Sequence, residues 1–207
     1  EHHPELYEEA LAVTRQIQSE SHRSYALSAL AEHLPERLYE EALAVTRQIQ
    51  DESDRSRALR ALAEHHPELY EEALAVTRQI QSESHRSYAL SALAEHLPER
   101  LYEEALAVTR QIQDESDRSR ALRALAEHHP ELYEEALAVT RQIQSESHRS
   151  YALSALAEHL PERLYEEALA VTRQIQDESD RSRALRALAE HHPELYEEAL
   201  AVTRQIQ

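Results

Sequence analysis

Apolar residues recur along the whole chain with the spacing of a helix that packs on two sides. One stripe falls at i, i+4, i+7 and i+11 and consists of Leu6, Ala10, Val13 and Ile17. A second stripe, about 100° round the same helix, consists of Tyr7, Leu11 and Thr14. Two stripes are typical of a helix inside a stack, and Pro4 suits its first turn.

A second apolar pattern follows each of these helices and predicts another. Ser19 or Asp51 precedes it, and both residue types are good N-caps. We expect the helix to continue to His33 or Leu34 before Pro35 stops it. Its buried face is expected to consist of Ala26, Leu27, Ala29 and Leu30.

Charge spacing and turn chemistry add two further expectations. Asp51–Arg55 and Arg60–Glu64 stand at i, i+4 and predict intrahelical ion pairs. The chain contains no glycine, so its connections must avoid positive φ or assign it to a polar residue.

The whole chain is one repeated unit of 63 residues. The copies are residues 1–63, 64–126 and 127–189, followed by a partial copy at 190–207. Each copy contains two similar halves of 31 and 32 residues, and Arg37 is the inserted residue. Two helices per half give thirteen expected helices: seven of a first type and six of a second. We therefore expect a single all-α repeat domain over residues 1–207, an α-solenoid of stacked antiparallel helix pairs.

The copies are identical in sequence, which bears on how the chain arose. The three full units carry no substitutions between them, which deliberate duplication of one natural or consensus pair explains most simply. A very recent natural expansion is the alternative.

The order of small and aromatic residues resembles that of tetratricopeptide-type repeats. Ala26-Leu27-Ser28-Ala29-Leu30-Ala31 precedes Leu38-Tyr39-Glu40-Glu41-Ala42-Leu43, a small-residue helix before a Tyr-x-Glu-Ala-like helix. The resemblance covers the whole chain and implies a right-handed superhelix whose small-residue helices line a concave, peptide-binding face. A closed α-toroid is the alternative.

Composition argues against several classes of partner. The net charge is -18, which opposes a phosphate backbone, so we expect no nucleic-acid partner. No apolar run approaches the roughly 20 residues that span a bilayer, so we expect no membrane partner. Without cysteine the chain has no thiol chemistry, and its compartment cannot be inferred from redox.

Histidines and carboxylates are the only candidates for metal or acid–base chemistry. One histidine per half should form a ladder: His2, His33, His65, His96, His128, His159 and His191. Successive rungs of a helical stack lie about 8–10 Å apart, too far to share one zinc ion. Glu8 and Glu9 point about 100° apart on a helix and cannot flank one bond. We therefore expect no metal, no cofactor and no enzymatic activity.

A better candidate site is the position where the two halves differ. Tyr25 and Ser28 of one second helix are replaced by Arg57 and Arg60 in the next. These side chains lie off the buried stripe, so we expect them to be exposed and Tyr25 to form a cation–π contact with Arg57. The candidate partner-binding residues are Tyr25, Arg57, Arg60, Tyr88, Arg120, Arg123, Tyr151, Arg183 and Arg186. Arginines at such a face suggest an acidic extended ligand.

Two functions from different classes follow from these features. The first is a designed or consensus-derived scaffold without catalysis that self-assembles, because the terminal helices lack polar caps and should expose apolar stripes. The second is a peptide- or protein-binding module that uses the Tyr/Arg face. Both remain hypotheses at the level of sequence.

Overall fold

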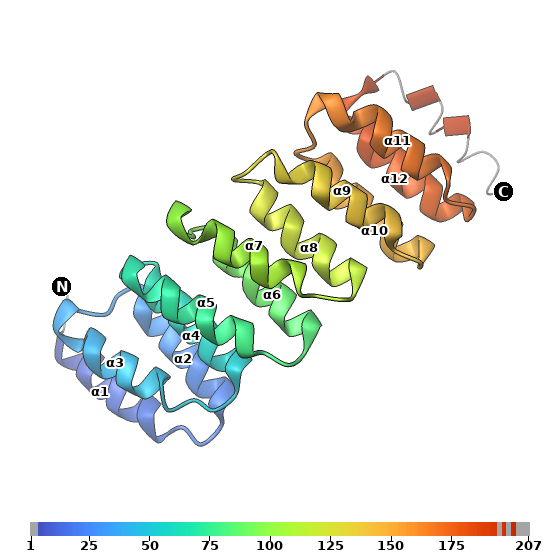
Figure 1. Ribbon diagram of the computed structural model, residues 1–207. Coiled ribbons are helices and arrows are strands. Elements are labelled where there is room, and N and C mark those ends of the chain that lie inside the picture. The colour runs from blue at the N-terminus through green and yellow to red at the C-terminus, as the bar shows by residue number, and fades with distance from the viewer. Residues whose placement is uncertain (1–3, 194–195, 198–199, 202–207) are drawn as a thin grey trace. The chain divides into compact units, whose positions relative to one another are not determined.

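A computed structural model of the chain describes residues 4–193, 196–197 and 200–201. Over these residues the chain folds into twelve α-helices and four short 3-10 helices (Figure 1). The α-helices are α1 (Pro4–Gln16), α2 (Glu20–Ala31), α3 (Tyr39–Thr46), α4 (Glu52–Ala63), α5 (Tyr70–Gln79), α6 (Glu83–Ala94), α7 (Tyr102–Arg110), α8 (Glu115–Ala126), α9 (Leu132–Gln142), α10 (Glu146–Ala157), α11 (Tyr165–Arg173) and α12 (Glu178–His191). The 3-10 helices are η1 (Glu36–Leu38), η2 (Pro67–Leu69), η3 (Glu99–Leu101) and η4 (Glu162–Leu164).

The two predicted helix types alternate along the chain. The odd-numbered helices are the first type and the even-numbered ones the second type. The predicted thirteenth helix, of the first type, falls mostly outside the described residues. His2 also lies outside them.

Each second-type helix begins at the predicted N-cap. The Ser19 hydroxyl accepts a hydrogen bond from the backbone N–H of His22, and an Asp51 carboxylate oxygen accepts one from Asp54 N–H at 2.9 Å. These bonds satisfy backbone donors that the first helical turn leaves open. The predicted Asp51–Arg55 pair is wrong, because Asp51 acts as the cap and Arg55 donates instead to the carbonyl of Ile49.

Most second-type helices end earlier than the sequence predicted, whereas α12 reaches His191, the position equivalent to His33, as predicted. α2 stops at Ala31, and the chain then turns before Pro35, so the expected extension to His33 or Leu34 is wrong. Leu34 lies outside the helix and is buried, with 7% of its surface exposed. No described residue has positive φ, so the connections without glycine avoid the left-handed region.

A proline and a 3-10 turn lead into most first-type helices. α1 itself begins at Pro4, as predicted, whereas Pro35 precedes η1 and α3 then begins at Tyr39. Arg37, the inserted residue, lies in η1 and its guanidinium forms an ion pair with Glu8 on α1. The extra residue of the longer half therefore links two consecutive first-type helices.

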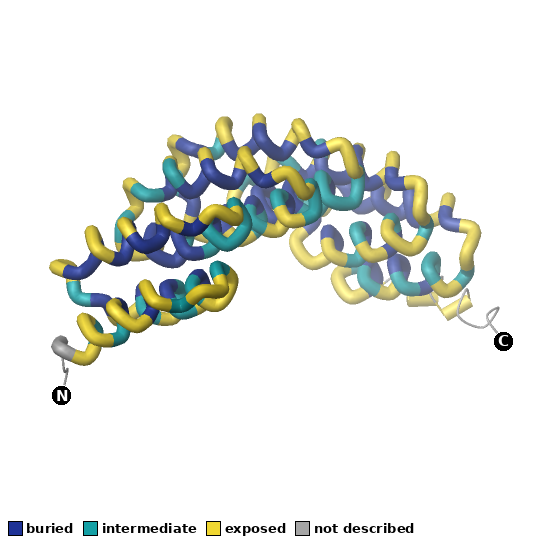
Figure 2. Tube along the Cα trace, turned by 90° about the horizontal axis from the view of Figure 1, so that it is seen from below, coloured by how far each residue is buried: buried dark blue, intermediate teal, exposed yellow. Residues whose placement is uncertain are grey.

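Aliphatic side chains form the core, together with small residues where helices approach closely. Leu11, Ile49, Leu59 and Leu62 are completely buried, and Tyr70 is among the largest fully buried side chains. Within each part of the structure, buried positions follow the helix sides that meet a neighbour and exposed positions follow the outer turns (Figure 2).

The chain divides into two compact units, with the boundary between Val108 and Thr109 inside α7. In the first unit α4 packs extensively on both α2 and α5, whereas α2 has little contact with α3. In the second unit α10 packs extensively on α12, and α8 on α9, whereas α10 has little contact with α11. The fold is an all-α solenoid in which helices pack on their neighbours in sequence. Its right-handedness, the toroidal alternative and the single-domain assignment stay predictions.

Consecutive second-type helices meet in two ways. We call the α2/α4 and α10/α12 contacts closed junctions, because these helices pack extensively, and the α4/α6 and α8/α10 contacts open junctions, because they pack less. At closed junctions a buried serine hydroxyl donates to the next second-type helix, from Ser24 to the carbonyl of Asp54 at 2.7 Å. The equivalent Ser56 turns instead to α5, where its hydroxyl lies 2.6 Å from that of Thr77. Thr77 donates to the carbonyl of Ala73, so Ser56 is the donor.

Candidate binding surface of the second-type helices

The predicted cation–π contact is present at the closed junctions. The Arg57 guanidinium carbon on α4 lies 4.5 Å from the centre of the Tyr25 ring on α2. Arg183 on α12 lies 4.3 Å from the centre of the Tyr151 ring on α10. Each contact is worth about 0.5–1 kcal/mol at a partly exposed site.

The tyrosines are exposed as predicted, but most of the arginines are not. Tyr25, Tyr88 and Tyr151 have 58–59% of their surface exposed. The expected exposure is wrong for five arginines, which are half-buried, and correct for Arg186, which is exposed. The five half-buried side chains are those of Arg57, Arg60, Arg120, Arg123 and Arg183.

Ion pairs with nearby carboxylates explain why these arginine side chains are half-buried and do not extend into solvent. Arg57 donates to Asp54 at 2.6 Å across one helical turn. Arg60 forms the predicted i, i+4 ion pair with Glu64. The same pairs recur in the other copies as Arg120–Asp117, Arg183–Asp180 and Arg123–Glu127. Each of these guanidinium groups therefore already has a negative partner.

A glutamate in the first turn of α2 also connects the two helices of the closed junction, at the end where both helices begin. One carboxylate oxygen of Glu20 accepts hydrogen bonds from the backbone N–H groups of Gln50 at 3.0 Å and Asp51 at 2.8 Å. These two bonds hold the pKa of Glu20 below its ordinary value. Glu146 makes the same contacts with Gln176 and Asp177 at the α10/α12 junction. Two predicted site residues, Tyr25 and Arg57, therefore lie in a junction that is fixed at both ends.

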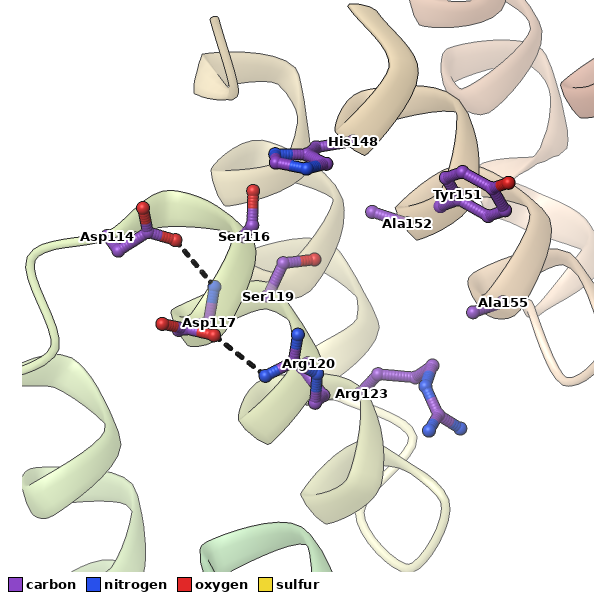
Figure 3. A pocket seen from close by; sticks show the side chains of 10 residues that line it. All are labelled: Asp114, Ser116, Asp117, Ser119, Arg120, Arg123, His148, Tyr151, Ala152 and Ala155. Carbon is purple, nitrogen blue, oxygen red and sulfur yellow. Dashed lines mark hydrogen bonds and ion pairs between the residues drawn. The ribbon is translucent and has the colours of Figure 1, made fainter. Parts of the chain in front are cut away.

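An open junction contains a pocket. Between α8 and α10 lies a pocket of about 510 Å³, large enough for an amino-acid side chain or a short peptide segment. Figure 3 shows its two walls, one from each helix. The α8 wall consists of Asp114, Ser116, Asp117, Ser119, Arg120 and Arg123, and the α10 wall consists of His148, Tyr151, Ala152 and Ala155.

The same pocket occurs between α4 and α6, with a volume of about 580 Å³. Its lining is residue for residue equivalent: Asp51, Ser53, Asp54, Ser56, Arg57 and Arg60 from α4, and His85, Tyr88, Ala89 and Ala92 from α6. The pocket is therefore a property of the 63-residue unit.

The structure brings six of the nine predicted site residues into these two pockets. Arg57, Arg60 and Tyr88 line one, and Arg120, Arg123 and Tyr151 line the other. Tyr25, Arg183 and Arg186 line neither pocket.

Sequence reasoning missed the histidine, serines and alanines of the lining. His148, Tyr151 and Ala155 stand at i, i+3 and i+7, which places them on one face of α10. Ser116 and Arg123 likewise stand at i and i+7 on α8. This spacing was visible in the sequence and could have identified both walls.

Two histidines outside the pockets show contacts with neighbouring side chains. His33 is exposed, and its ring nitrogen lies 3.8 Å from Glu32. His66, in the adjacent series, packs against the Tyr39 ring with 3.9 Å between ring centres, and its Nδ1 lies 2.9 Å from Glu68. Among the residues that the structure describes, no three His, Asp or Glu side chains are grouped so that they could hold a metal ion. The absence of metal and cofactor chemistry stays a prediction.

No protein-family model and no curated protein matches the chain. Within the described residues, no helix combines the length and the apolar character needed to cross a membrane. Any assignment of function must therefore rest on the site itself.

Proposed function

We propose that the chain is a non-catalytic repeat scaffold that binds an extended polypeptide across its second-type helices. The observation that carries this proposal is the pocket that recurs with the same lining at α4/α6 and α8/α10. Each pocket combines tyrosine and arginine, which are enriched at binding hot spots, with small alanines that allow another chain to approach closely.

The test is a displayed library of random peptides selected against the purified chain. Selected peptides are then measured against a variant in which both pockets are filled, Ala92→Leu with Ala155→Leu. Both alanines are exposed on helices, and leucine is a good helix former, so the variant should fold. We expect affinity to fall at least about tenfold, which corresponds to the loss of one good contact.

Ala29→Leu provides the matched control. It makes the same substitution in the same local sequence on α2, and Ala29 lines neither pocket. If the selected peptides bind the filled variant as tightly as they bind the original chain, the proposal is wrong.

A self-assembling scaffold is the second candidate, and the surface of α1 favours it. Leu6 and Val13 are each 57% exposed, whereas the equivalent Leu38 in η1 and Val45 on α3 are 5% and 2% exposed. The apolar stripe that interior helices bury is therefore open on α1, which favours contact with a second copy of the chain. A mass that stays at 23.9 kDa over a wide concentration range would argue against this candidate.

We also infer that the array was engineered by duplication of one tetratricopeptide-like pair of helical hairpins. The complete identity of the 63-residue copies and the regular stacking of neighbouring helices support this origin. An exposed surface in natural copies would accumulate substitutions, and these copies contain none.

A further inference from the structure

We propose that each open-junction pocket binds an uncharged aromatic ring, the phenol or indole side chain of a bound polypeptide, between the tyrosine and alanines of one helix and the arginines of the other. This inference rests on the proposed binding function and specifies what the pocket selects. It applies to the α4/α6 pocket and the α8/α10 pocket alike, because their linings are equivalent.

The shape and lining of the α8/α10 pocket suit a flat ring. Ala152 and Ala155 form a low apolar strip beside the Tyr151 ring, and Arg120 and Arg123 come from the opposite wall (Figure 3). Guanidinium groups stack well on aromatic faces.

The chain itself uses this type of contact at the neighbouring junction. There Arg183 lies 4.3 Å from the centre of the Tyr151 ring. An incoming ring in the open junction would meet the same two residue types.

The charges of the pocket favour a neutral ligand over an acidic one. Arg120 is paired with Asp117 and Arg123 with Glu127, so the guanidinium groups offer no excess positive charge. The chain as a whole carries a charge of -18, which repels anions. The acidic ligand suggested by the sequence is therefore replaced by a neutral one, because carboxylates of the same helix neutralise the arginines.

Polar groups on both walls suit the polar edge of a phenol or an indole. Ser116 carries a hydroxyl on the α8 wall and His148 an imidazole on the α10 wall. A hydroxyl and an imidazole can each accept a hydrogen bond from a phenol O–H or an indole N–H. Phenylalanine lacks this group, so tyrosine and tryptophan side chains are the preferred occupants.

Three small probes that share one indole ring test the inference on the full chain. N-acetyl-tryptophanamide is neutral, indole-3-acetate is an anion and tryptamine is a cation. The chain contains no tryptophan, so indole fluorescence reports only the probe. We expect the neutral probe to bind and the anion to bind several-fold more weakly, because the charge of -18 repels it. The same charge attracts the cation, so we expect any binding of tryptamine to persist when the pocket is filled.

The pocket-filling variant gives the structural control. In Ala92→Leu with Ala155→Leu we expect affinity for N-acetyl-tryptophanamide to fall at least about tenfold, the contribution of a good aromatic contact. Ala29→Leu should leave it unchanged. Tighter binding of indole-3-acetate, or binding of N-acetyl-tryptophanamide that the filled variant retains, would overturn the inference.

The inference and the proposed function can fail separately. If library-selected peptides bind through the pockets but lack tyrosine and tryptophan, the aromatic inference is wrong and the binding function stands. If neither peptides nor probes depend on the pockets, both are wrong.

Discussion

At the scale of single residues, one tyrosine of the repeated stretch has two different environments. Tyr39 donates its hydroxyl to the carbonyl of Ala31 at 3.1 Å. Tyr70 stands at the same place in the other half, but its hydroxyl is buried without a hydrogen-bond partner in the protein, and burial raises its pKa to about 12. The link before Tyr39 is longer by Arg37, and only the hydroxyl that follows the longer link reaches a carbonyl.

Phenylalanine substitutions should separate these two environments. Tyr39→Phe should lower the free energy of unfolding by about 1 kcal/mol, because the hydrogen bond from the Tyr39 hydroxyl to the carbonyl of Ala31 is lost. Tyr70→Phe should leave it unchanged or raise it, because a buried hydroxyl without a partner is removed. Denaturant unfolding followed by circular dichroism measures both variants, and equal losses would contradict this account.

At the scale of helices, ion pairs and carboxylate contacts join neighbouring elements. Arg47, at the end of α3, forms two hydrogen bonds with the carboxylate of Glu72 on α5, at 2.9 and 2.7 Å. These bonds hold the pKa of Glu72 below its ordinary value of 4.5. The folded chain therefore binds this proton more weakly than the unfolded chain does. The contribution to stability is complete above about pH 4.5 and is lost as the pH falls through the lowered pKa.

Acid should therefore weaken the joint between α3 and α5. Glu72→Gln should lower the free energy of unfolding at neutral pH by a few tenths of a kcal/mol, because the pair is partly exposed. It should also make stability less dependent on pH below about 4.5. Denaturant titrations at a series of pH values measure both effects.

Glu103→Gln is the matched control for this experiment, since Glu103 is an exposed glutamate on a first-type helix. If both variants keep the same acid dependence as the original chain, the Arg47–Glu72 pair does not link pH to stability.

The helices, the caps and the residue types of the site could be predicted from the sequence. The spacing of apolar residues predicted the twelve α-helices that the structure describes. Ser19 and Asp51 correctly predicted where the second-type helices begin. Each wall could have been identified from its spacing, but the pairing of two walls into a pocket could not be predicted, because it depends on which neighbour a helix packs against. Ser24 and Ser56 have the same place in the repeat, yet one bonds to a second-type helix and the other to a first-type helix.

At the scale of the whole molecule, charge and the exposed stripe of α1 act in opposite directions. The charge of -18 keeps copies apart at neutral pH, and protonation of all 14 histidines would bring it to -4. The apolar stripe with Leu6 and Val13 stays exposed on α1 and favours contact between copies.

Self-association should therefore increase as the pH approaches 5.2, the isoelectric point of the sequence. Light scattering coupled to size exclusion, at about pH 7.5 and near the isoelectric point, should give a larger mass at the lower pH. Leu6→Gln with Val13→Gln should reduce the increase, because the stripe becomes polar. An unchanged hydrodynamic size between the two pH values would contradict the prediction.

The difference between closed and open junctions decides how the array can grow or shrink. Removal of residues 32–63 would leave α2 beside α6, which has Tyr88 at the position that Arg57 occupies on α4. Tyr25 would then lose the guanidinium of Arg57. Insertions and deletions therefore preserve the contacts between second-type helices only in steps of 63 residues. The unit that can be added or removed is the pair of hairpins and not the single hairpin.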